Sequence, residues 1–182
     1  MNGDKKMKKN KLLKLVIIGC MTVFALTACG DKKEDTKNSE TTAKAEESTK
    51  EVEINIKDFT KQIAEKRTDV SLVEMTEEYV KGVMSFDVSK VSEYSVYVDA
   101  SGTSVDEYGV FKANDDTAED VEKMLQTYLD MRLDTWMDEY MPEQKPKVEN
   151  AVINNVGNYY IYAILSDSER EATFSAFEDA AK

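Results

Sequence analysis

An abrupt change of composition at Cys29 determines which residues of this chain are left to form a folded domain. Six lysines between Lys5 and Lys14 come first, and a mostly apolar run from Leu15 to Leu26 follows them. This order of a basic and an apolar zone, with small residues before the polar chain begins, is typical of an export signal. A membrane-spanning helix needs roughly 20 apolar residues, and this run is shorter. We therefore expect residues 1–28 to be a signal peptide that is removed.

The end of this signal reads Leu26-Thr27-Ala28-Cys29 and resembles the lipobox of bacterial lipoproteins. In such proteins the chain is cut before the cysteine, here between Ala28 and Cys29, and the cysteine thiol carries diacylglycerol. The resemblance implies a protein held at the extracytoplasmic face of the cell membrane by lipid on Cys29. Each buried methylene of an acyl chain adds about 0.8 kcal/mol, and two chains together give stable anchoring.

Removal of the signal peptide makes the chain more acidic. Residues 1–28 hold six of the 24 basic residues and one of the 36 acidic residues, so the mature chain carries 18 against 35, a net charge of −17. So acidic a protein is repelled by phosphate backbones, and we expect no nucleic-acid partner. It should also stand off an anionic lipid surface rather than lie on it.

The composition excludes several kinds of chemistry. The chain has no histidine, and its two cysteines are Cys20, lost with the signal, and Cys29, used for lipid. Catalytic triads with histidine or a free cysteine are thereby excluded, as are zinc sites of the usual ligands. A serine–lysine nucleophile is not excluded, but no spacing indicates one. A pair of carboxylates like that of a glycosidase can always be found in so acidic a chain, because such pairs arise by chance. We expect no catalytic residue, no metal site, no cofactor and no disulfide.

The mature chain divides into two parts. Residues 29–51 are polar and charged and, between Asp31 and Lys50, contain no aromatic or β-branched aliphatic residue, which predicts a disordered acidic and polar tether. Residues 52–182 have the length of one domain. At its start Val52, Ile54 and Ile56 alternate with polar residues, which indicates a short strand or an extended lead-in.

The patterns within residues 52–182 predict helices alternating with two β-hairpins. Tyr159, Ile161 and Ala163 alternate with further apolar residues, which indicates a strand covered on both faces. The longest helix is expected to end before Pro142. The expected helices are 58–66, 72–84, 117–141 and 167–181, and the expected strands are 94–98, 108–111, 148–156 and 158–165. We expect a single α+β domain in which a mainly antiparallel sheet of about four strands, formed by the two hairpins, packs with helices.

Three features are candidates for a site. The acidic stretch 114–120 has oxygen ligands that calcium prefers, but acids at a helix start also explain it as capping, with Asp116 and Glu119 or Thr117 and Asp120 as the capping pair. Arg132 falls within the apolar arc of its predicted helix. It is either an anion anchor or a structural arginine that is paired internally or extends to solvent.

The third candidate is a group of tyrosines. All nine follow the tether, and Tyr159, Tyr160 and Tyr162 lie on one predicted strand. Exposed, they would form a stacking platform for a sugar or a protein partner. Buried, they are core and sheet residues of the kind that strands favour.

The last two-thirds of the chain resembles a bacterial lipoprotein family with domain of unknown function 4358. The resemblance spans roughly residues 70–165. It rests on the hairpin Tyr94–Phe111, the helix entered at Asp116, Tyr140-Met141-Pro142-Glu143-Gln144, Asn150-Ala151-Val152 and Gly157-Asn158-Tyr159-Tyr160. It implies a secreted or lipid-anchored protein, typically of Gram-positive bacteria, and brings no activity or site residues.

These observations favour a non-enzymatic binding module for a component of the cell envelope or for a protein partner. An alternative is a small-ligand-binding lipoprotein associated with a transporter, although such receptors usually have two lobes and about twice this length. An enzyme that acts on the envelope is the third hypothesis.

Overall fold

The computed structural model describes residues 53–182. The signal peptide, Cys29, the predicted tether and Val52 lie outside the described residues. The helices are α1 (Ile56–Lys66), α2 (Glu77–Gly82), α3 (Ala118–Asp134), α4 (Lys145–Glu149) and α5 (Asp167–Ala180), with short 3₁₀ helices at Val88–Lys90 and Pro142–Gln144. The strands are β1 (Leu72–Glu74), β2 (Val91–Asp99), β3 (Glu107–Ala113), β4 (Val152–Val156) and β5 (Tyr159–Ile164).

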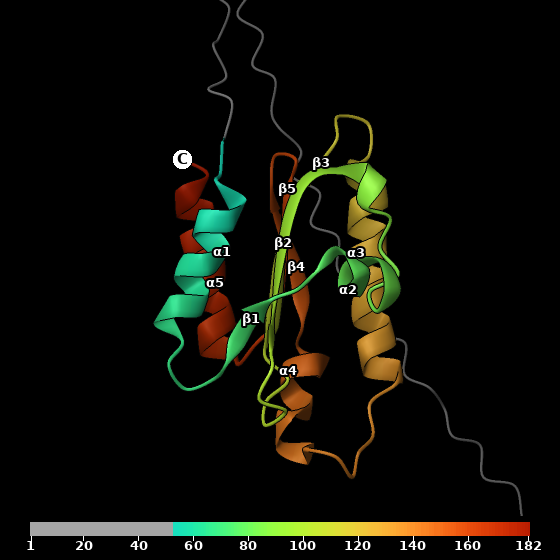
Figure 1. The fold of residues 1–182 in the computed structure, drawn as a ribbon, viewed down its shortest axis with the longest axis vertical. Helices are drawn as coiled ribbons and strands as arrows, with labels where there is room; N and C mark the ends of the chain where they lie inside the picture. The colour runs from blue at the N-terminus through green and yellow to red at the C-terminus, as the bar shows by residue number, and fades with distance from the viewer. Residues whose placement is uncertain (1–52) are drawn as a thin grey trace, which may run out of the picture. The chain divides into compact units, whose positions relative to one another are not determined.

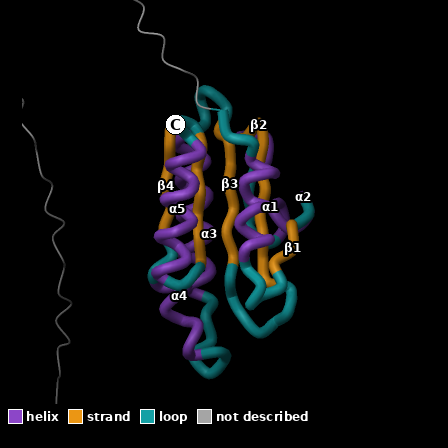
Figure 2. The backbone as a smooth tube through the Cα atoms, turned by 90° about the vertical axis from the view of Figure 1, so that its left-hand side faces the viewer, coloured by secondary structure: helices purple, strands orange, loops and turns teal. Residues whose placement is uncertain are grey.

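The five strands form one antiparallel sheet in the order β1-β2-β3-β5-β4. Helices α1 and α5 cover one face, and α2 and α3 cover the other, so the sheet is the middle of three layers (Figure 1). Viewed from the α1 side, the sheet extends from β4 at one edge to β1 at the other (Figure 2). The fold is the expected α+β domain with an antiparallel sheet, and it has one strand more than expected.

The core lies on both faces of the sheet because β3 and β5 are buried between the helix layers. Tyr160, Tyr162 and Ile164 belong to the core on the α3 side. Tyr159 and Ile161 belong to the cores on the opposite side, where Phe177 of α5 is fully buried. The predicted alternation of β5, with apolar residues on both faces, is confirmed.

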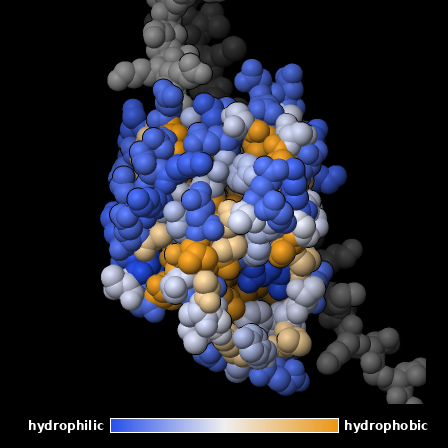
Figure 3. All heavy atoms as spheres, viewed as in Figure 1, coloured by the Kyte–Doolittle hydropathy of each residue, from blue (hydrophilic) through white to orange (hydrophobic). Residues whose placement is uncertain are grey.

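The surface is more polar than the core. The outer side of α1 and α5 is mainly hydrophilic, and hydrophobic residues show in smaller groups between the two helix layers (Figure 3). Among residues 53–182 the most exposed large hydrophobic residue is Met137, at 65% exposure.

The helix predicted over residues 72–84 is wrong in its first half. Leu72–Glu74 is a strand that pairs with Tyr97–Asp99, and the helix begins only at Glu77. Leu72 packs on the α1 side of the sheet, and the tertiary pairing outweighs any local helix preference in so short a segment.

The long helix and the third predicted strand also differ from expectation. Helix α3 ends at Asp134 rather than just before Pro142, since Asp130, Asp134 and the Thr135 cap interact poorly with a helix C-terminus. Residues 145–149 form α4, with proline in its first turn where no N–H is needed, so β4 begins only at Val152.

The helix starts show where capping is satisfied. Thr117 is the N-cap of α3, but its hydroxyl donates to the Lys90 carbonyl at 2.5 Å instead of capping the helix, so the predicted capping box is absent there. A capping box is present at α5, between Ser166 and Glu169. The start of the domain is an extended lead-in, in which Ile54 is buried before Ile56 opens α1.

Candidate functional site

Two neighbouring carboxylates, Asp106 and Glu107, are the most unusual buried groups of the domain. Both are fully buried at the start of β3. Successive side chains of a strand point to opposite faces, so each carboxylate enters a different helix layer. A buried carboxylate is costly unless it is paired and hydrogen-bonded, and both of these are.

Glu107 lies on the α3 side within a cluster of tyrosines and one arginine. The hydroxyls of Tyr128 and Tyr162 each donate to Glu107 Oε1 at 2.6 Å. Arg132 Nη1 forms an ion pair with Glu107 Oε2 and donates to the Tyr128 hydroxyl at 2.9 Å. Tyr128 and Arg132 are four residues apart on α3, so one helix face carries both.

The surroundings of Arg132 keep it charged, and those of Tyr128 and Tyr162 keep both tyrosines neutral. Burial lowers the pKa of Arg132, but Glu107 and the hydroxyls of Tyr128 and Tyr79 together raise it on balance, so the guanidinium stays charged. Burial and the charge of Glu107 raise the pKa of Tyr128 and of Tyr162 well above their usual range. Both tyrosines therefore remain neutral hydroxyl donors to Glu107.

The close packing of this cluster extends to Gly109. A Cβ placed at Gly109 would lie 2.7 Å from Cε1 of Tyr162 and 2.9 Å from Cγ2 of Val96. Because the Tyr162 hydroxyl is held by Glu107, its ring has little freedom to move aside. The absence of a side chain at Gly109 thus allows the tyrosine to reach the carboxylate.

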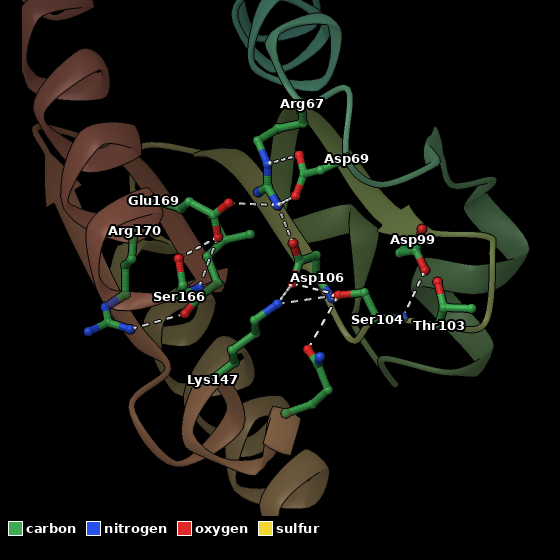
Figure 4. A network of polar contacts seen from close by, with 12 residues as sticks. Arg67, Asp69, Asp99, Thr103, Ser104, Asp106, Lys147, Ser166, Glu169 and Arg170 are labelled. Atoms are coloured by element: carbon green, nitrogen blue, oxygen red, sulfur yellow. Dashed lines mark hydrogen bonds and ion pairs between the residues drawn. The ribbon is translucent and has the colours of Figure 1, made fainter. Parts of the chain in front are cut away.

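Asp106 lies on the other side of the sheet, in a polar network that links the β2–β3 connection to α1, α4 and the start of α5 (Figure 4). Its Oδ2 pairs with Nη2 of Arg67, the C-cap of α1, and its Oδ1 pairs with Nζ of Lys147 on α4. The Ser104 hydroxyl donates to Oδ1 at 2.8 Å. Arg67 Nη2 also lies 2.9 Å from Glu169 Oε1 at the start of α5.

Burial lowers the pKa of Arg67, but Asp69, Asp106 and Glu169 together raise it on balance. Arg67 therefore carries its positive charge among three carboxylates. Its side chain is only 12% exposed, compared with 64% for Asp69. Since the Asp106 side chain is fully buried, its contact with Arg67 is the one of the three that water screens least.

The polar network around Asp106 contains one serine–lysine contact, between Ser104 and Lys147. Lys147 Nζ lies 3.4 Å from Ser104 Oγ. The ammonium donates to Asp106, however, and so has no lone pair with which to take a proton from the serine. The arrangement is that of a structural ion pair and does not activate Ser104 as a nucleophile.

Of the residues singled out from the sequence, Arg132 and Tyr162 meet at Glu107, while the other candidates lie elsewhere. Arg132 is held against Glu107, with 23% of its side chain exposed. Tyr159, Tyr160 and Tyr162 are at most 6% exposed, so they do not form a surface for stacking. Cys29 lies outside the described residues.

The acidic stretch 114–120 is used for local contacts. Asn114 donates to the Ser89 carbonyl at 2.9 Å, and Asp120 pairs with Lys90 at 2.8 Å. No group of three or more acidic side chains suited to a metal ion occurs within residues 53–182.

A groove at the edge of the sheet was not anticipated from the sequence. It has a volume of about 360 Å³ and follows β2 from Val91 to Ser95, where β1 no longer covers that strand. Lys57 of α1 lies on one side and Glu77 of α2 on the other. The acidic residues Glu74, Glu77 and Glu93 were the sign of this groove in the sequence. They come together, however, only through a strand pairing that local patterns did not predict.

Comparison with known proteins identifies the domain but no activity. The family model described as Domain of unknown function (DUF4358) matches residues 64–165. This match confirms the resemblance to that domain. Neither the curated proteins nor the solved structures give a match.

Proposed function

This chain belongs to the family defined by the Domain of unknown function DUF4358, and we propose that it is a lipid-anchored, extracytoplasmic binding domain. The observation that carries the proposal is the Leu26–Cys29 motif behind a basic and then apolar leader. Lipid on Cys29 would hold the chain at the cell membrane, and residues 30–51 would separate the domain from the lipid headgroups.

Two features of the domain support binding rather than catalysis. The buried carboxylates Asp106 and Glu107 are both occupied by internal cations and hydroxyl donors. The open groove beside β2 is lined by both charged and apolar residues. Such a surface suits a protein or envelope partner. Within residues 53–182 no helix is long and apolar enough to cross a bilayer.

Replacement of Cys29 by serine tests the anchor. We expect Cys29→Ser to abolish incorporation of labelled palmitate and to leave an uncleaved or mislocalised precursor, because the oxygen of serine does not replace the thiol in the thioether. Cys20→Ser is the matched control, since it changes the other cysteine of the chain, which lies within the signal peptide, and it should be lipidated normally. Palmitate labelling of Cys29→Ser at the unmodified level would contradict the anchor.

Cross-linking on intact cells tests the binding role. We expect one or a few specific neighbours to be captured with the lipidated protein and not with a lipoprotein of unrelated sequence expressed at the same level. Identification of the captured chains by mass spectrometry would give the partner. Recovery of the same abundant envelope proteins from both samples would count against a binding role.

A further inference from the structure

Strand β2 has an open edge over half of its length. It contains nine residues, whereas β1 contains three, which pair with Tyr97, Val98 and Asp99. One further bond follows, in which Met75 N–H donates to the Val96 carbonyl at 2.8 Å. Beyond it, no strand within residues 53–182 pairs with this edge of β2.

The backbone groups at this edge are oriented to accept another strand. In an antiparallel pair, alternate residues direct their N–H and C=O toward the same neighbour. Val96 faces the β1 side, so Tyr94, two residues earlier, directs its N–H and C=O toward the open edge. The groove runs along this stretch, between α1 and α2.

The groove is lined by acidic side chains on one face of the sheet and by apolar side chains on the other. Glu74 and Glu93 lie on the α1 side, where Ser95 Oγ donates to Glu74 at 3.2 Å and holds its carboxylate beside the groove. On the α2 side Met75 and Tyr94 are partly buried apolar walls. With Glu77 and Lys57, the lining comprises three carboxylates and one ammonium.

We propose that this groove binds an extended, basic segment of another protein as an additional strand beside β2. Its backbone would pair with Tyr94, its lysine or arginine side chains would face Glu74 and Glu93, and its apolar side chains would face Met75 and Tyr94. Strand addition is a common way in which peptides bind to an exposed sheet edge. A second copy of this chain fits poorly, because it would bring the same carboxylates against one another.

This inference rests on the proposed binding function and supplies the chemical class of the partner. The test uses the mature lipidated chain in neutral detergent micelles at 0.15 M salt. The probe is the capped peptide Lys-Val-Lys-Val-Lys, which matches the two faces of the groove. We expect saturable binding, with NMR shift changes concentrated at the amides of residues 92–96.

Two peptides and two variants separate strand addition from simple charge attraction. The isomer Lys-Lys-Val-Val-Lys and a probe methylated at the N–H of both valines, which would face β2 in an antiparallel pair, should each bind more weakly by about tenfold, a loss of about 1.4 kcal/mol. The double variant Glu74→Lys/Glu93→Lys should weaken binding of the probe by about tenfold. Glu119→Lys/Glu122→Lys carries the same charge change on α3 and should alter it by less than about twofold, because salt screens distant charges.

Equal affinity for the three peptides, or shift changes spread over the acidic surface, would overturn the proposal. Absence of peptide binding would also overturn the proposal. This outcome is expected if the chain's own residues before 53 occupy the groove, or if the β2 edges of two copies pair with each other. The proposed binding function is tested independently of this groove. If cross-linking captures specific neighbours but the peptide does not bind, the binding function is still supported. If the peptide binds but cross-linking captures no neighbour, the binding function is contradicted.

Discussion

Replacing Glu107 with alanine is expected to lower the free energy of unfolding by about 3–5 kcal/mol, the usual cost of removing one partner from a buried ion pair. The variant leaves the Arg132 guanidinium without its carboxylate and removes the acceptor of two tyrosine hydroxyls. Chemical denaturation monitored by circular dichroism would measure the loss. An equal slope of free energy against denaturant in both proteins would show that the comparison is valid.

A double-mutant cycle with Arg132 tests whether the two side chains act together. Arg132→Ala should also lower stability, because it leaves a fully buried carboxylate unpaired. The double variant should cost less than the sum of the single variants by at least about 1 kcal/mol. Asp120→Ala, which breaks the exposed pair with Lys90, should cost at most about 1 kcal/mol. A fully stable Arg132→Ala variant would contradict a structural role for the arginine.

The parts of the fold that follow from local patterns were predictable. The alternation of apolar residues in β5 placed it inside the sheet, and the helix starts near Asp58 and Asp167 lie within two residues of the observed ones. These segments could be predicted locally, because in each of them the buried apolar residues recur with the period of the helix or strand that forms. The two hairpins and the α+β class followed from them.

The parts that were missed depend on contacts between distant segments. Strand β1 is three residues long and exists because it pairs with β2. The strand predicted over residues 108–111 did not include Asp106 and Glu107, and acids are rarely buried. Their partners come from α1, α3 and α4, which no local pattern connects to β3. Arg132 within an apolar arc was the one sign that an internal carboxylate existed.

The candidate binding surface at the sheet edge could not be predicted from local sequence patterns either. From the sequence, Glu74, Glu77 and Glu93 are three acids among many. They line one groove because α2 follows β1 closely and because β2 extends past the end of β1. The candidate surface is therefore a consequence of unequal strand lengths, which only the assembled fold determines.

Asp106→Ala is expected to lower the free energy of unfolding by about 3–5 kcal/mol, because two cations then lose a buried carboxylate. Arg67 and Lys147 have side chains that are 12% and 20% exposed, so water replaces the lost contact incompletely. The loss should be accompanied by faster amide exchange in α4, which Lys147 ties to the sheet. Thermal unfolding and hydrogen exchange would measure the two effects.

Asp69→Ala is the matched control for this prediction, because Asp69 pairs with the same Arg67 but is 64% exposed. It should cost at most about 1 kcal/mol, the usual range for an exposed ion pair. Asp106→Asn should fall between the two, since the amide oxygen still accepts a hydrogen bond while the charge is lost. Equal losses for Asp69→Ala and Asp106→Ala would contradict the prediction, because Asp106 is fully buried and pairs with Lys147 in addition to the shared Arg67.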